Sequence, residues 1–72
     1  MKIAIKKIDI YKSKLNTSEI EKKFGAQKIG ELDYQTEFAD QLNEIIFEFH
    51  AKYEVDFVSY LRNHCVTGRI FT

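Results

Sequence analysis

The sequence predicts an all-α fold, in which a short first helix, a loop and a long second helix form a helical hairpin that pairs with a second copy. Residues 34 to 65 contain neither glycine nor proline, and apolar residues recur there at steps of three and four, the spacing of one helical face. A single domain of 72 residues buries only about 60% of the surface that its unfolded chain exposes. We therefore expect a homodimer that adds to a thin core.

The cysteine and histidine content and the length of the apolar stretches argue against several kinds of protein. The lone Cys65 excludes an intrachain disulfide, and His50 and His64 lack the paired spacing of zinc ligands. Lysines interrupt every apolar run near the start, and no stretch approaches the ~20 residues of a membrane span. We expect an intracellular protein without a metal, a cofactor or membrane contact.

Charge is distributed unevenly although the formal net charge is zero. Residues 1 to 28 hold eight lysines, and residues 29 to 61 hold eight acids against Lys52 alone. A basic segment that folds beside an acidic helix explains this asymmetry better than a nucleic-acid-binding arm, because the lysines are not interleaved with arginines and aromatic residues. We expect no direct contact with nucleic acid.

Residues 1 to 15 are predicted to be an extended or flexible arm. Ile3 and Ile5 lie on one side of a period-two pattern and Ile8 and Ile10 on the other, with two lysines between the pairs. A strand needs a second strand to pair with, and no other segment offers a clear one. The segment 1 to 11 is therefore either a short strand or an arm packed on a partner.

The first helix is predicted over residues 18 to 25. Ser18 and Glu21 have the spacing of a capping box, in which each side chain satisfies a backbone amide of the other residue. Ile20 and Phe24 lie one turn apart on one face, and Gly25 can supply the left-handed residue that ends a helix.

The second helix is predicted to be continuous over residues 34 to 65, which gives a length of ~48 Å at 1.5 Å per residue. Asp56 would fall on its apolar stripe, so the stripe rotates there or the chain kinks near residues 53 to 56. A helix of this length exceeds what so small a domain can cover. Its apolar residues are predicted to form the core and the dimer interface: Phe38, Leu42, Ile45, Phe49, Tyr53, Phe57, Val58 and Leu61.

No catalytic residue is predicted. The sequence has no glycine-rich phosphate loop, no G-x-S-x-G elbow and no His-Glu-x-x-His pair. Asp40, Glu44 and Glu48 follow one another at four-residue spacing and could bind a cation or share a proton. Such a row opposite an apolar stripe is typical of a solvated helix face, and we do not expect an enzyme.

Residues 68 to 72 are predicted to be a short flexible tail. Gly68 would end the long helix and release Arg69, Ile70 and Phe71, an arginine followed by two apolar anchors. This combination suits a linear motif that binds a protein partner. The alternative is that Ile70 and Phe71 fold back onto the helical core.

With its basic start, its predicted helix-loop-helix and its Arg69-Ile70-Phe71 tail, the chain resembles the small internal scaffolding proteins, of the CpmB type, of staphylococcal pathogenicity islands. The family tail reads Arg-Ile-Ile-Phe, and this chain has one isoleucine fewer. The resemblance implies a homodimer in the bacterial cytoplasm, transiently inside procapsids. It implies that Arg69, Ile70 and Phe71 bind the major capsid protein of a helper phage and redirect assembly to a smaller shell.

A second function is suggested by the acidic middle of the chain. A helix that carries Glu37, Asp40, Glu44 and Glu48 on one face could mimic nucleic acid and inhibit a host nucleic-acid enzyme. Deletion of the tail separates the two functions, because it would abolish capsid binding and leave such an inhibitor active.

Overall fold

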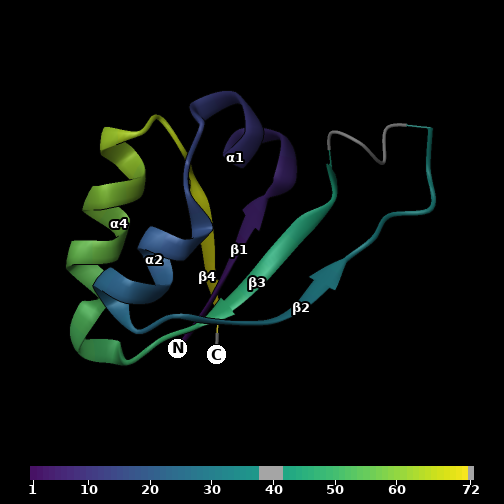
Figure 1. Cartoon of the computed structure of the whole chain (residues 1–72). Helices are drawn as coiled ribbons and strands as arrows, with labels where there is room; N and C mark the ends of the chain where they lie inside the picture. The colour runs from purple at the N-terminus through teal and green to yellow at the C-terminus, as the bar shows by residue number, and fades with distance from the viewer. Residues whose placement is uncertain (38–41, 72) are drawn as a thin grey trace.

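Four strands form one antiparallel sheet in the computed structural model of the chain, which describes residues 1–37 and 42–71 (Figure 1). The all-α prediction, including the helix-loop-helix, is therefore wrong. In chain order the elements are β1 (Lys2–Lys6), α1 (Lys7–Ser13), α2 (Thr17–Phe24), β2 (Gln27–Leu32), β3 (Glu44–Glu48), the 3-10 turn η1 (Ala51–Tyr53), α4 (Glu54–Asn63) and β4 (Gly68–Phe71).

The strands are ordered β2-β3-β1-β4, so the first strand of the chain lies inside the sheet. Its register places Ile3 opposite Phe47 of β3 and opposite Ile70 of β4. Helices connect β1 to β2 and β3 to β4, which gives the split βαβ, or ferredoxin-like, topology with α1 as an additional helix. Residues 1 to 15 are thus a central strand, a helix and a connection, and not an arm.

Among the described residues of the predicted long helix over residues 34 to 65, the structure has β3, η1 and α4 in place of one continuous helix. The sequence Ile45-Ile46-Phe47 explains the strand, because consecutive β-branched and aromatic residues pack well on a pleated surface. The steps of three and four in this segment coincide with a helical period without forming one helix. The 3-10 turn η1 ends at Tyr53 and α4 begins at Glu54, so the helical geometry changes within residues 53 to 56, where a kink was one of two alternatives.

Helix α2 covers Thr17–Phe24, within one residue of the predicted range. Gly25 follows it with a φ of 62°, the left-handed conformation expected from the sequence. The N-terminal cap differs from the prediction, because the side chain of Asn16, and not that of Ser18, accepts the hydrogen bond. The donor is the backbone amide of Ser18 at 2.9 Å.

Helix α4 ends at Asn63, and the left-handed residue that follows its C-terminal cap is Cys65. Cys65 has a φ of 58°, and the amides of Cys65 and Val66 donate to the carbonyls of Arg62 and Leu61, each at 2.9 Å. This pair of bonds is a Schellman motif. The following residue, Val66, is buried, so the connection to β4 is anchored in the core.

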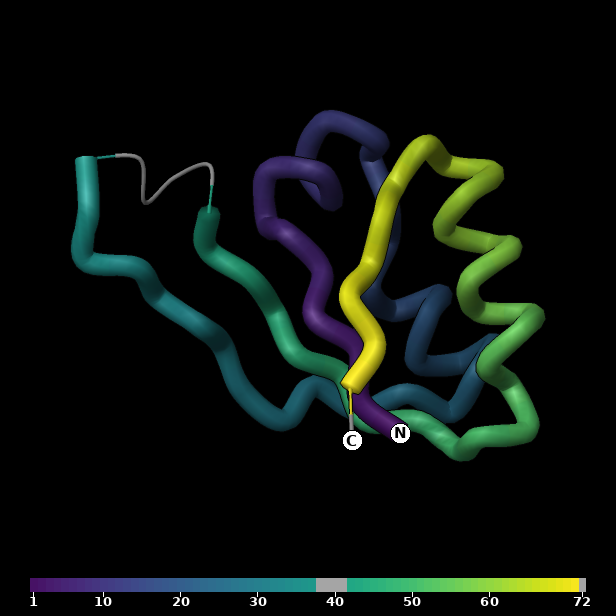
Figure 2. The backbone as a smooth tube through the Cα atoms, turned by 180° about the vertical axis from the view of Figure 1, so that it is seen from behind, coloured from purple at the N-terminus to yellow at the C-terminus, as the bar shows by residue number. Residues whose placement is uncertain are grey.

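The core lies between one face of the sheet and the two helices α2 and α4, which lie on the same side of it (Figures 1 and 2). Ile20 and Phe24 come from α2, and Phe24 stacks on Phe57 of α4 with ring centroids 4.8 Å apart. Phe57 also contacts Phe49, the residue after β3, at 5.0 Å. Aromatic packing thus joins both helices to the sheet.

The residues predicted to form the core and the dimer interface differ in how deeply they are buried. Phe49, Phe57 and Leu61 are buried, and Ile45 and Tyr53 are partly buried against them. Leu42 and Val58 are half-buried, whereas Phe38 lies outside the described residues. Burial of the first group is completed within one chain, so these residues belong to the core of the monomer.

Candidate interaction surface on the open face of the sheet

The sheet has one face that α2 and α4 do not cover (Figures 1 and 2). Side chains alternate between the two faces of a strand, and Ile3, Ile5 and Phe47 point toward the helices because they belong to the core cluster. The remaining positions of β1, β3 and β4 define what we call the open face: Lys2, Ala4 and Lys6 of β1, Glu44, Ile46 and Glu48 of β3, and Arg69 and Phe71 of β4.

The predicted flexible tail is strand β4, which pairs with β1 along its whole length. Gly68 makes this pairing possible, since a Cβ at this position would overlap the side chain of Ile3. Glycine is thus needed here for a close approach to the core, and the prediction that it releases a tail is wrong. The chain leaves α4 after Asn63 and enters β4 at Gly68.

The three residues predicted to bind a partner are divided between the two faces of the sheet. Ile70 lies on the helix side and packs against the core. Arg69 and Phe71 lie on the open face, where the centre of the Arg69 guanidinium is 5.3 Å from the centroid of the Phe71 ring. A cation placed over an aromatic ring is attracted by its negative face. The structure thus brings together two of the three predicted residues.

Arg69 reaches across the central strand to Glu44 of β3. Its Nη2 donates to Oε1 of Glu44 at 3.1 Å, although Arg69 is paired with Ala4 of the intervening strand. Alanine leaves room for the long side chain to cross, and Ala4 itself is only 1% exposed. The side chain of Arg69 stays 57% exposed, so it is fixed in position and accessible.

Glu44 is the buried anion of the open face, with a side chain that is 8% exposed. Its Oε1 also accepts a hydrogen bond of 2.9 Å from the hydroxyl of Tyr34. That bond, together with burial and the negative charge of Glu44, raises the pKa of Tyr34 above its ordinary value. Glu44 therefore accepts hydrogen bonds from two donors and is buried. The helical prediction had placed it in an exposed row of acids, and this placement is wrong.

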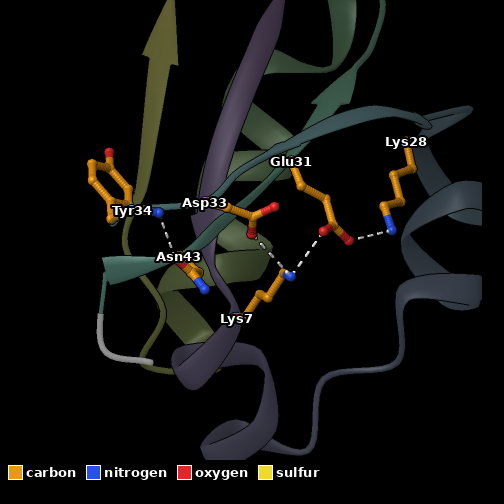
Figure 3. A network of polar contacts seen from close by, with 6 residues as sticks. All are labelled: Lys7, Lys28, Glu31, Asp33, Tyr34 and Asn43. Carbon is orange, nitrogen blue, oxygen red and sulfur yellow. Dashed lines mark hydrogen bonds and ion pairs between the residues drawn. The ribbon is translucent and has the colours of Figure 1, made fainter. Parts of the chain in front are cut away.

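Tyr34 also fixes the connection between β2 and β3. Its backbone amide donates to Oδ1 of Asn43 at 2.8 Å, so the two ends of the connection are held together (Figure 3). The sequence analysis missed Tyr34 as a site residue. A signal was present, since a tyrosine shortly after one strand and an acid at the start of the next lie side by side when the strands pair.

A second polar cluster lies at the β2 edge, away from the open face (Figure 3). Glu31 accepts from Lys7 at 2.9 Å and from Lys28 at 2.7 Å, and Lys7 is also 3.7 Å from Asp33. The two lysine hydrogen bonds lower the pKa of Glu31 to about 2. The cluster connects β2 to Lys7, the first residue of α1. Each charged side chain in it has a partner of opposite charge within the cluster.

Within residues 1–37 and 42–71 there is no group of three or more histidine, cysteine or acidic side chains that could hold a metal ion. Nδ1 of His64 lies 2.8 Å from the carbonyl oxygen of Tyr60, and Cys65 is an exposed free cysteine. None of the described helices has the length and apolar character that crossing a membrane requires.

Single-stranded RNA is bound by some four-stranded sheets through aromatic side chains on their uncovered face, where bases stack. Here the open-face positions of the two central strands are occupied by lysine, alanine, glutamate and isoleucine. The aromatic residues near this face are Phe71, on the edge strand, and Tyr34, which follows β2 and donates to Glu44. The described central strands therefore lack the aromatic platform on which such sheets stack bases.

No protein-family model, no curated protein and no solved structure matches this chain. The fold and the face define a small split βαβ domain with a fixed arginine and an adjacent phenylalanine on its uncovered sheet. A fold of this kind does not by itself imply a function; the residues of the open face are what distinguish this domain.

Proposed function

We propose that the chain is a non-enzymatic protein-binding module, and that its contact surface is the open face around Arg69 and Phe71. The supporting observation is the placement of Arg69, which is 57% exposed and yet held by Glu44 and Phe71. Arginine and aromatic residues supply much of the binding energy in protein interfaces. A side chain that is already ordered loses less conformational freedom when it binds.

The charges of the open face favour a partner with an acidic contact segment. Lys2, Lys6 and Arg69 contribute three positive charges, whereas Glu48 is the exposed acid of this face and Glu44 is buried. Complementary charge accelerates association and disfavours wrong partners. Ile46 and Phe71 are half-buried and offer apolar area between the charged groups, as the centre of an interface requires.

The major capsid protein of a helper phage, suggested by the resemblance of the tail, stays a predicted partner. In this proposal Arg69 and Phe71 would contact it from a strand, and not from a flexible tail. A role as a capsid-size scaffold would then depend on how the rigid domain is oriented on the capsid protein. The nucleic-acid mimic has less support, because its row of acids required a helix over residues 34 to 48.

The experiment places a photo-reactive side chain at position 71 of the full chain in cells, with position 55 as the control. Val55 is exposed on α4, on the other side of the molecule. We expect the variant labelled at position 71 to cross-link to a partner protein. The variant labelled at position 55 should not cross-link to that protein. Equal cross-linking at both positions, or none at position 71, would overturn the proposed surface.

Purified capsid protein tests the predicted partner separately. If it binds, Arg69→Ala should weaken binding by roughly 30-fold, as for a hot-spot residue worth about 2 kcal/mol. Arg62→Ala, at an exposed arginine of α4, should leave binding unchanged. Absence of binding by the wild-type chain would remove the capsid protein as the partner and would leave the cross-linking result to decide the surface.

A further inference from the structure

The two outer strands of the sheet differ in how their free edges are protected. Strand β2 has a register shift between Lys28 and Gly30, and its Lys28 and Glu31 are charged. Irregular register and charged side chains are ways in which proteins prevent an edge strand from pairing with another chain. Strand β4 pairs with β1 without a shift, has no proline, and carries one charged residue, Arg69, whose side chain is directed across the open face to Glu44.

Hydrogen bonds on the other side of β1 determine which backbone groups of β4 point outward. Met1 and Phe49 exchange backbone bonds of 2.9 and 2.8 Å, and the amide of Lys7 donates to the carbonyl of Asn43 at 2.9 Å. Odd-numbered residues of β1 are therefore directed toward β3. Because antiparallel bonding alternates along a strand, even-numbered residues are directed toward β4.

The partners of those even-numbered residues are Phe71, opposite Lys2, and Arg69, opposite Ala4. The backbone groups of Arg69 and Phe71 therefore face β1, and those of Ile70 face away from the sheet. Among the described residues, no strand lies beyond β4. The N–H and C=O of Ile70 are thus positioned to pair with an added strand.

We propose that this added strand is β4 of a second copy of the chain, antiparallel, with Ile70 opposite Ile70 of the partner subunit on a two-fold axis. At the axis the two Ile70 residues exchange both backbone bonds. Directly opposite residues share a face of the sheet, so the two isoleucine side chains meet on the helix side. The register is self-complementary, as a two-fold interface requires.

Charge on the open face also agrees with this register. Arg69 lies opposite Phe71 of the partner subunit, and not opposite Arg69 of the partner subunit. Like charges directly opposite one another destabilise a sheet, whereas the arginine and the ring already attract each other within one chain. The result is a continuous sheet of eight strands with two copies of the Arg69 and Phe71 pair at its centre.

This inference goes beyond the proposed function and does not depend on it, because it rests on the strand edge and not on the open face. Pairing along the three residues Arg69, Ile70 and Phe71 covers less than the ~800 Å² per partner of a standard interface, so the dimer is weak and concentration-dependent. A doubled surface would nevertheless bind a repetitive partner with increased avidity.

The test is sedimentation equilibrium of the full chain between about 10 μM and 1 mM, the range in which weak association is measurable. We expect the average mass to rise from 8.5 kDa toward twice that value. Ile70→Pro removes the outward N–H, which is tolerated on an edge strand, and should weaken association at least tenfold. Ile70→Val is the matched control, since valine has as many side-chain carbons as proline and keeps the N–H.

Amide hydrogen exchange of the wild-type chain gives a second readout that does not require the proline variant to fold. Protection of the Ile70 amide should increase with protein concentration, while that of Ile29 on the β2 edge should not. A monomer at every concentration would overturn the proposal. Unchanged association of a folded Ile70→Pro, or concentration-dependent protection at Ile29 in place of Ile70, would do the same.

Discussion

Arg69 of the edge strand β4 donates a hydrogen bond of 3.1 Å to Glu44 of β3, across the intervening strand β1. The bond connects the first residue of β3 to a residue more than twenty positions later in the chain. It passes over Ala4, which is buried beneath it. A single charged contact thus spans the uncovered face of three of the four strands.

The first prediction concerns the coupling of these two residues. Arg69→Ala removes one of the two donors of a buried carboxylate, and we expect it to lower the free energy of unfolding by about 1 kcal/mol, at the lower end for a bond to a charged group because Arg69 is solvated. Urea unfolding of Arg69→Ala, Glu44→Gln and the double variant measures the coupling. A coupling energy near zero would show that the contact adds nothing to stability.

Gly68 gives the second prediction. Gly68→Ala places a Cβ inside the volume of the Ile3 side chain, and overpacking of this kind typically costs 1–3 kcal/mol, so we expect a loss of about that size. Gly30→Ala is the matched control, because a Cβ there meets no atom within 4 Å. Thermal unfolding of the two variants should differ clearly, and equal melting temperatures would contradict the close approach of β4 to β1.

The end of α4 gives the third prediction. Cys65 has a φ of 58°, a conformation that costs roughly 1–2 kcal/mol for a residue with a Cβ. Glycine removes this cost but loses more backbone entropy on folding, so Cys65→Gly should stabilise the chain by about 0.5–1 kcal/mol. Cys65→Ala keeps the Cβ and should leave stability nearly unchanged. Chemical denaturation measures both, and a destabilising glycine would refute the strain.

The fourth prediction is a pH dependence at the β2 edge. The pKa of Glu31 is lowered from 4.5 to about 2, so its ion pairs contribute stability above pH 4.5 that is lost as the pH falls toward 2. The stability difference between the wild type and Glu31→Gln should therefore shrink over this interval. Urea unfolding at pH 6 and pH 3 tests it, and a difference that grows on acidification would have the wrong sign.

Local signals predicted α2 correctly. Ile20 and Phe24 share one face and Gly25 ends the helix, and each signal acts within a few residues. The sheet depends on pairing over long distances, such as Ile3 with Phe47. No pattern within residues 1 to 15 identifies that partner, and the partner strand itself has apolar spacing that also fits a helix.

The sequence drew attention to two residues of the candidate site, Arg69 and Phe71, but it did not predict that they lie on a strand. Arg69 and Phe71 were selected as an arginine near an apolar anchor, and they do lie together. Ile70 was selected with them, but alternation along a strand sends it to the opposite face. The role of Glu44 could not be predicted, because its two donors come from Tyr34 and Arg69, which only the folded sheet brings to it.

The place of β1 inside the sheet has a consequence for biosynthesis. A ribosome makes β1 early and β4 about 65 residues later, which takes roughly 3 to 13 seconds at 5–20 residues per second. During that interval one side of β1 has no strand to pair with, even after β3 is available. The nascent chain must therefore keep an isoleucine-rich strand from aggregating until the segment Gly68–Phe71 leaves the exit tunnel and closes the sheet.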